Sequence, residues 1–133
     1  MMKPEAMRRN TLEGGQVTLV VFRRKKDRWF TGVALELDIV EEMEDPLALL
    51  QSLTEAVWLH VRGVVVDRLS HGLLNRWAPA SYWRVHEALR AGRVPRSLRP
   101  VYFVFTIALP ALVAAKQPAH VTPRAPELAT ARG

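Results

Sequence analysis

The chain of 133 residues contains no cysteine. This absence excludes disulfide bonds, thiolate metal sites and a thiol nucleophile, and it suits a cytoplasmic protein. A glycine-rich phosphate loop is missing too, because Gly14 and Gly15 stand alone. The longest apolar stretch, residues 101–115, falls short of the roughly twenty residues that a membrane-spanning helix needs, and Pro110 interrupts it. We therefore expect a cytoplasmic protein without a membrane segment.

Patterns that would indicate catalysis are also missing. The four histidines lack the spacing of metal ligands, and no serine stands in a nucleophile-elbow context. A two-metal nuclease site gathers carboxylates from several elements. In this chain they crowd one strand and its exit, whereas residues 66–133 contain only three acidic side chains. We therefore expect no enzyme, no catalytic residue, no metal and no cofactor. The crowded carboxylates are Glu36, Asp38, Glu41, Glu42, Glu44 and Asp45.

What is present indicates one globular domain with an uneven charge. Hydrophobic residues make up 49% of the chain and charged residues 24%, which is ordinary for a globular protein of this length. The net charge is +6. Residues 1–65 hold nine basic and ten acidic side chains, whereas residues 66–133 hold ten and three. The basic half indicates either nucleic-acid contact or arginines that coat solvated helices. The candidate contacts are Arg84, Arg90, Arg93, Arg96 and Arg99.

The first half predicts a hairpin. Residues 16–23 and 29–35 are two short apolar runs that flank the charged stretch RRKKDR, so the chain is expected to reverse at 25–28. In the first run both alternating sets of side chains are largely apolar, as in a central strand that is covered on both faces or in a strand with one face against a partner. A third strand is expected to pass through residues 36–40 and to end in a solvated acidic stretch at 41–45.

A long helix is predicted next. Asp45 can cap its first turn, and Pro46 has no N–H to leave unpaired there. Apolar residues then recur at spacings of one, three and four, which places them on one helical face. They are Leu49, Leu50, Leu53, Val57, Val61 and Val64.

Two more helices and a strand are expected beyond residue 66. The helices would span 67–77 and 82–91, the second capped by Ser81 and ended by Gly92. A short turn between them is typical of a helix-turn-helix, but the second helix lacks a cluster of Gln, Asn or Ser to read base edges, so paired packing helices are favoured. Residues 101–109 are β-branched and aromatic, as in a strand that ends at Pro110.

The domain organisation follows from these elements. Residues 1–15 are expected to be a disordered lead and residues 110–133, rich in Pro and Ala, a disordered tail. Residues 16–109 then form one α+β domain, in which a small, mainly antiparallel sheet of three to four strands packs against the long helix. The helices of about 66–100 are an insertion before the last strand.

The stretch ALELDIVEEMEDPLALLQSLTEAVWLHV resembles the HicB-like antitoxin domain. Its strand is Glu36–Val40, its helix starts at Asp45-Pro46, and the helix contains the family's Glu-Ala-Leu/Val pattern as Glu55-Ala56-Val57. The hairpin of residues 17–34 fits as well, although its tip has no glycine where family members often have one. The resemblance covers about half the chain and implies a sheet like a truncated ribonuclease H.

The resemblance implies an interaction protein that neutralises a small, basic ribonuclease toxin. We hypothesise that the toxin would bind the acidic strand exit through charge complementarity. The residues concerned are Glu41, Glu42, Glu44 and Asp45. Two alternatives stay open: a solitary relative that associates with itself as a homo-oligomer through an exposed sheet edge, and nucleic-acid binding by the basic half.

Overall fold

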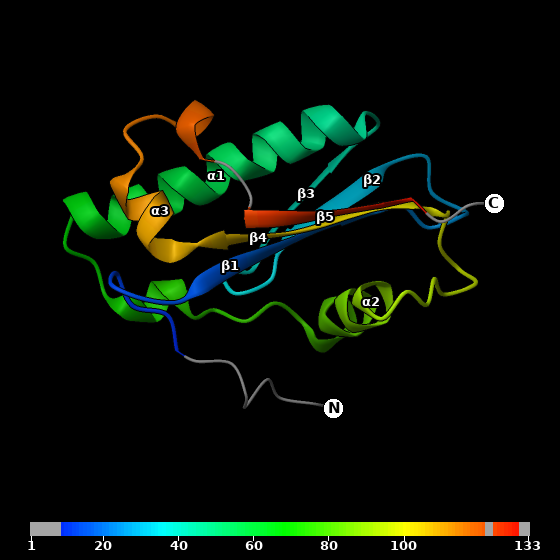
Figure 1. Cartoon of the computed structure of the whole chain (residues 1–133), viewed down its shortest axis with the longest axis horizontal. Helices are drawn as coiled ribbons and strands as arrows, with labels where there is room; N and C mark the ends of the chain where they lie inside the picture. The colour runs from blue at the N-terminus through cyan, green and yellow to red at the C-terminus, as the bar shows by residue number, and fades with distance from the viewer. Residues whose placement is uncertain (1–8, 122–123, 131–133) are drawn as a thin grey trace.

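The fold is a three-layer sandwich with a sheet between helices (Figure 1). A computed structural model describes residues 9–121 and the backbone of residues 124–130. Its sheet has five antiparallel strands in the order β3-β2-β1-β4-β5. The α+β class and the antiparallel sheet are therefore confirmed, with five strands where three to four were predicted. The strands are β1 (Gln16–Phe22), β2 (Phe30–Ala34), β3 (Ile39–Met43), β4 (Val101–Ala108) and β5 (Arg124–Thr130).

The central strand β1 has both faces buried, as its sequence predicts. Leu19 and Val21 join the apolar cluster on one side of the sheet, whereas Val20 and Phe22 join a second cluster on the other side. All four side chains are fully buried. Because side chains alternate along a strand, the run of apolar residues 19–22 places apolar side chains on both faces, and both faces are covered.

The first face is covered by α1 (Pro46–Val66) together with the short α3 (Leu109–Ala114). Asp45 caps α1 by accepting a hydrogen bond from the backbone N–H of Leu47 at 3.0 Å, as predicted. The helix approaches β2 closely because Gly32 has no side chain: a Cβ there would lie 3.1 Å from Leu49. Within the described chain, no helix combines the length and the apolarity needed to cross the membrane.

The second face is covered by α2 (Ala80–Arg90) and by the irregular chain around it. The predicted helix over residues 67–77 is wrong. After α1 the backbone turns left-handed at Arg68, with φ of 52°, and forms only the 3-10 turn η1 (His71–Leu74). This segment therefore holds no pair of helices for a helix-turn-helix. Pro79, not Ser81, is the N-cap of α2, which ends before Gly92 as predicted.

Residues 67–100, which include η1 and α2, also determine the end of the sheet from which the chain enters β4. It leaves the C-terminal end of α1, crosses beneath the sheet and returns to the opposite end before β4 begins (Figure 1). As a result β4 runs antiparallel to β1, with Val17 paired to Ile107. A chain that entered β4 directly from α1 would run parallel to β1. The predicted insertion is thus a whole layer of the sandwich.

Both predicted disordered ends need correction where the structure describes them. Asn10 is buried, and its side-chain amide donates hydrogen bonds to the carbonyls of Gln16 and Leu74 at 2.9 and 3.0 Å. These bonds fix residues 10–15 against the domain. The predicted tail forms α3, the 3-10 turn η2 (Pro118–His120) and β5. Residues 1–8, 122–123 and 131–133 lie outside the described chain.

Candidate nucleic-acid interface

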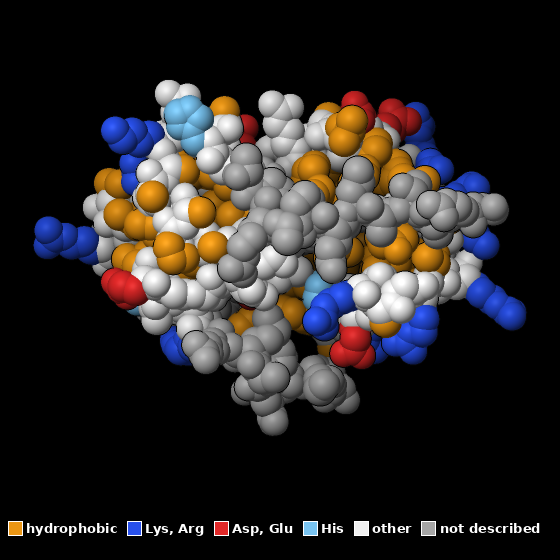
Figure 2. All heavy atoms as spheres, in the orientation of Figure 1, with side chains coloured by type: hydrophobic (Ala, Val, Ile, Leu, Met, Phe, Trp, Pro, Cys, Tyr) orange, Lys and Arg blue, Asp and Glu red, His pale blue; other side chains and the backbone are white. Residues whose placement is uncertain are grey.

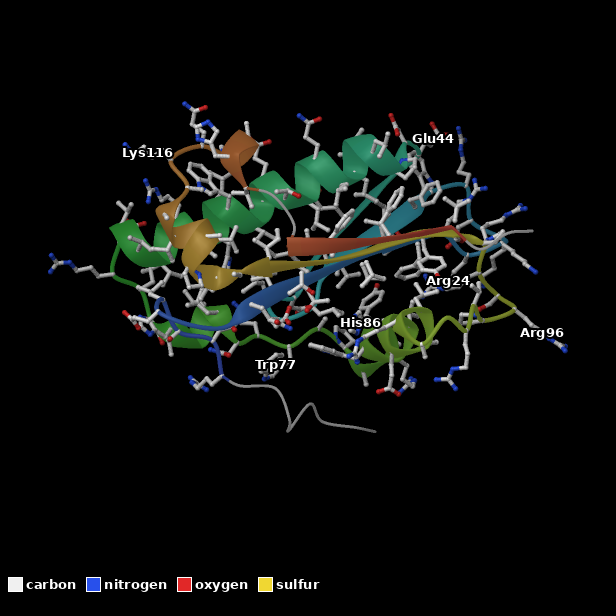
Figure 3. The ribbon with its side chains drawn as sticks, viewed as in Figure 1. Arg24, Glu44, Trp77, His86, Arg96 and Lys116 are labelled. Atoms are coloured by element: carbon white, nitrogen blue, oxygen red, sulfur yellow. The ribbon has the colours of Figure 1, made fainter. Side chains whose placement is uncertain are left out.

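Two charged segments that lie about seventy residues apart in sequence meet at one end of the sheet, where Arg24 and Leu98 form an isolated β-bridge. We call residues 23–28 and 93–99 together the basic end. The backbone N–H of Lys25 donates to the carbonyl of Ser97 at 2.7 Å, and that of Arg99 donates to the carbonyl of Arg23 at 2.8 Å. Figure 3 shows Arg24 and Arg96 at this end, away from Trp77 and Lys116. The backbone bonds therefore hold the two segments in a fixed relation.

The basic end carries the whole net charge of the protein. Its two segments contain eight Lys and Arg side chains and a single acidic one, Asp27, which gives +7. The rest of the chain holds eleven basic and twelve acidic side chains, which gives −1. Figure 2 shows basic side chains gathered at this end of the molecule, with others projecting singly elsewhere. Such clustering on one surface is the electrostatic pattern of a polyanion-binding protein.

Aromatic rings support the cations of the hairpin. The guanidinium carbons of Arg23, Arg24 and Arg28 lie 5.2, 5.3 and 5.4 Å from the ring centroids of Phe30, Phe22 and Trp29. Contacts at this range are attractive, because the face of an aromatic ring is electronegative. They hold the guanidinium groups of the three arginines beside these rings.

The remaining cations of the basic end are available to a ligand. Lys25, Lys26, Arg93 and Arg96 are exposed, and none pairs with a carboxylate of the described part of the chain. Arg24 reaches Asp27 only at 4.0 Å. A surface that presents several unpaired cations on a fixed backbone can neutralise several phosphates at once.

The hairpin turn explains why no glycine is needed at the tip. The N–H of Asp27 donates to the carbonyl of Arg24 at 3.0 Å, so Lys25 and Lys26 occupy the centre of the turn. This is one residue earlier than predicted. Among the described residues, only Asp38 and Arg68 are non-glycine positions with positive φ, so the turn is open to any side chain. Two lysines at its centre are thus compatible with the backbone and point charge into solvent.

The structure divides the five predicted arginine contacts. Arg93, Arg96 and Arg99 belong to the basic end, and Arg99 also donates to the carbonyl of Lys25 at 3.3 Å. Arg84 and Arg90 lie instead on the exposed side of α2. Sequence reasoning missed the hairpin cations, because they stand in the half of the chain whose net charge is −1. The signal that would have found them is the run RRKKDR itself.

The four predicted toxin contacts do not form one surface. Glu41 alternates with Ile39 and Met43 on the α1 side of β3, whereas Glu42 is exposed on the other side. Both residues lie inside β3, so the expectation that the strand ends before them is corrected. Glu44 accepts two hydrogen bonds from Arg28, at 2.9 and 2.7 Å. The fourth carboxylate, that of Asp45, caps α1.

Glu36 is the most unusual acidic side chain. It lies in the β2–β3 turn, is only 1% exposed, and accepts hydrogen bonds from the backbone N–H and the hydroxyl of Thr18, at 2.6 and 2.8 Å. Burial raises the pKa of its carboxyl from 4.5 to about 7, against the opposing effect of the Thr18 bonds. Its backbone carbonyl accepts from the N–H of Arg76, so Glu36 joins β1 to the second face.

Taken together, the fold and this surface define a small α+β protein with one strongly basic end. Among the residues that the structure describes, no group of three or more His, Asp or Glu side chains is placed to hold a metal ion. Comparison of the chain with protein-family models, with curated proteins and with solved structures finds no match.

Proposed function

We propose that the protein binds nucleic acid through the basic end. The observation that carries this proposal is the meeting of two distant basic segments, whose side chains sum to +7, at one end of the sheet. Phosphate backbones are the natural ligand of such a surface, because each phosphate contact releases a bound counterion. The contacts would come chiefly from the exposed side chains Lys25, Lys26, Arg93, Arg96 and Arg99.

An anionic lipid surface is the main competitor for a basic patch, and the geometry favours nucleic acid over it. Cations alone attract an anionic lipid surface, and an apolar face that enters the bilayer beside them strengthens the binding. Among residues 23–29 and 93–99, only Trp29 is a large apolar side chain that is exposed. One ring gives little apolar area to bury in lipid.

The experiment is a titration of fluorescently labelled oligonucleotides with the full chain, read by anisotropy over a series of salt concentrations. We expect binding that weakens with salt, with a slope of log K against log salt of about −3 for a single strand, as about four neutralised phosphates would give. A slope near zero or the absence of binding would overturn the proposal. Binding to phosphatidylserine vesicles but not to oligonucleotides would overturn it in favour of lipid.

Neutralisation of a basic toxin through the strand exit stays a prediction, and the geometry lends it less support. Of its four carboxylates, those of Glu44 and Asp45 already have partners within the chain. Those of Glu41 and Glu42 lie on opposite sides of β3. The order of three strands followed by a Pro-started helix supports a HicB-like origin of the fold, which stays a prediction, as does self-association.

A further inference from the structure

Next to the basic end lies one feature that phosphate binding does not require. Trp29 directly follows the charged turn, and 45% of its surface is exposed. Large apolar side chains at the start of a strand are ordinarily buried, as the neighbouring Phe30 is. An exposed indole among cations is the arrangement by which proteins stack the bases of single-stranded nucleic acid.

The surroundings of Trp29 hold the ring in place. The guanidinium carbon of Arg28 lies 5.4 Å from the ring centroid. Arg28 is itself fixed by two hydrogen bonds to one carboxylate oxygen of Glu44, at 2.9 and 2.7 Å. A ring that is already positioned loses little conformational freedom when a base stacks on it, which strengthens binding. Lys25 and Lys26, four and three residues before Trp29, supply cations for the phosphates on either side of a stacked base.

We infer that Trp29 is a stacking platform for an unpaired base, so that the ligand of the basic end is single-stranded nucleic acid. This inference rests on the proposed function and narrows it. A duplex keeps its bases stacked on one another and offers this surface only phosphates, whereas a single strand offers phosphates to the lysines and a base to the indole. Both single-stranded RNA and single-stranded DNA have this chemistry.

The test compares three probes of equal strand length: twelve-nucleotide oligo(dT), a phosphodiester strand of the same charge without bases, and a duplex. Wild type is expected to bind oligo(dT) on the order of tenfold more tightly than the base-free strand. Trp29→Ala should remove that difference and leave affinity for the base-free strand unchanged. Trp29→Phe should keep most of it, because a phenyl ring also stacks. Oligo(U) in place of oligo(dT) separates RNA from DNA.

Leu59→Ala is the matched control, because it also removes an exposed apolar side chain, from the outer side of α1. It should change no affinity. Equal binding of oligo(dT) by wild type and Trp29→Ala, or an equal loss for the base-free strand, would overturn the stacking inference and leave the proposed function standing. Tighter binding to the duplex would also overturn it. Failure of wild type to bind any of the three probes would overturn both.

Discussion

Two stretches of the first half, residues 23–28 and 36–45, are each dense in charge of one sign, the first basic and the second acidic, but their charges are arranged differently in the folded protein. The five cations of the first stretch converge with three arginines from the far half, and most remain exposed. The six carboxylates of the second stretch are dispersed: one is buried, one pairs with Arg28, one caps α1, and the others lie on different sides of the chain. A dense run of charges in the sequence therefore does not by itself form a charged surface. The path of the backbone determines whether those side chains lie together.

This comparison assigns the two stretches different tasks, and variants can separate them. Removing a carboxylate that folding uses should change stability and leave oligonucleotide binding almost unchanged. Removing an exposed cation of the basic end should do the reverse.

Glu36 should give the largest effect on stability. Its folded-state pKa of about 7 lies above the ordinary value of 4.5, so the folded protein binds the extra proton more readily than the unfolded chain. The contribution of Glu36 to the free energy of unfolding should therefore be greatest below about pH 4.5 and should be lost as the pH rises through 7. The total change is about 3 kcal/mol. Urea unfolding between pH 5 and 8 measures it.

Glu36→Gln should flatten that pH dependence, because the amide stays neutral while its oxygen still accepts the bond from the N–H of Thr18. The matched control is Glu42→Gln, an exposed position on β3, which should keep the wild-type slope. An unchanged slope in Glu36→Gln would show that another group titrates.

Asp45 should have a smaller effect. Asp45→Ala removes the side-chain acceptor for the N–H of Leu47 and should lower the free energy of unfolding by about 1 kcal/mol. Asp45→Asn, which keeps a capping oxygen, should lose much less. Both are measured by urea unfolding. A loss of oligonucleotide affinity in Asp45→Ala would contradict the division of tasks.

Glu44 should have the smallest effect on stability. Its pair with Arg28 is exposed, with 72% and 55% of the two side chains accessible, and such pairs contribute about 0–1 kcal/mol. Glu44→Gln should, however, tighten oligonucleotide binding slightly, because it removes a negative charge beside the basic end while the amide oxygen can still accept hydrogen bonds from Arg28. Weaker binding would instead show that Glu44 acts mainly by holding Arg28 next to Trp29.

Local patterns predicted the elements that depend on neighbouring residues. The strand alternation around β1, the Asp45-Pro46 helix start and the β-branched run of β4 each carry their signal within a few residues. The apolar character of both faces of β1 indicated that its second face is covered, either by the chain itself or by a partner. Periodicity failed between α1 and α2, where the left-handed Arg68 interrupts a segment with suitably spaced leucines.

The candidate site depends on contacts that no local pattern contains. Counting charge by halves hid the cations of the hairpin, since acidic residues of the same half cancelled them. Only the return of the chain from α2 to β4 brings residues 93–99 against the hairpin. The buried position of Glu36 is likewise unforeseen, because a carboxylate in a turn is ordinarily exposed and its partner, Thr18, lies on another strand.

The central claim is that the basic end, and not net charge in general, binds nucleic acid. The direct measurement compares the double variant Lys26→Glu/Arg96→Glu with the double variant Arg76→Glu/Lys116→Glu. Both reverse two charges at exposed positions and change the net charge equally, the first inside the basic end and the second outside it. We expect on the order of tenfold or greater loss of oligo(dT) affinity in the first and little change in the second, with equal urea midpoints. Equal losses of affinity in the two variants would contradict the account.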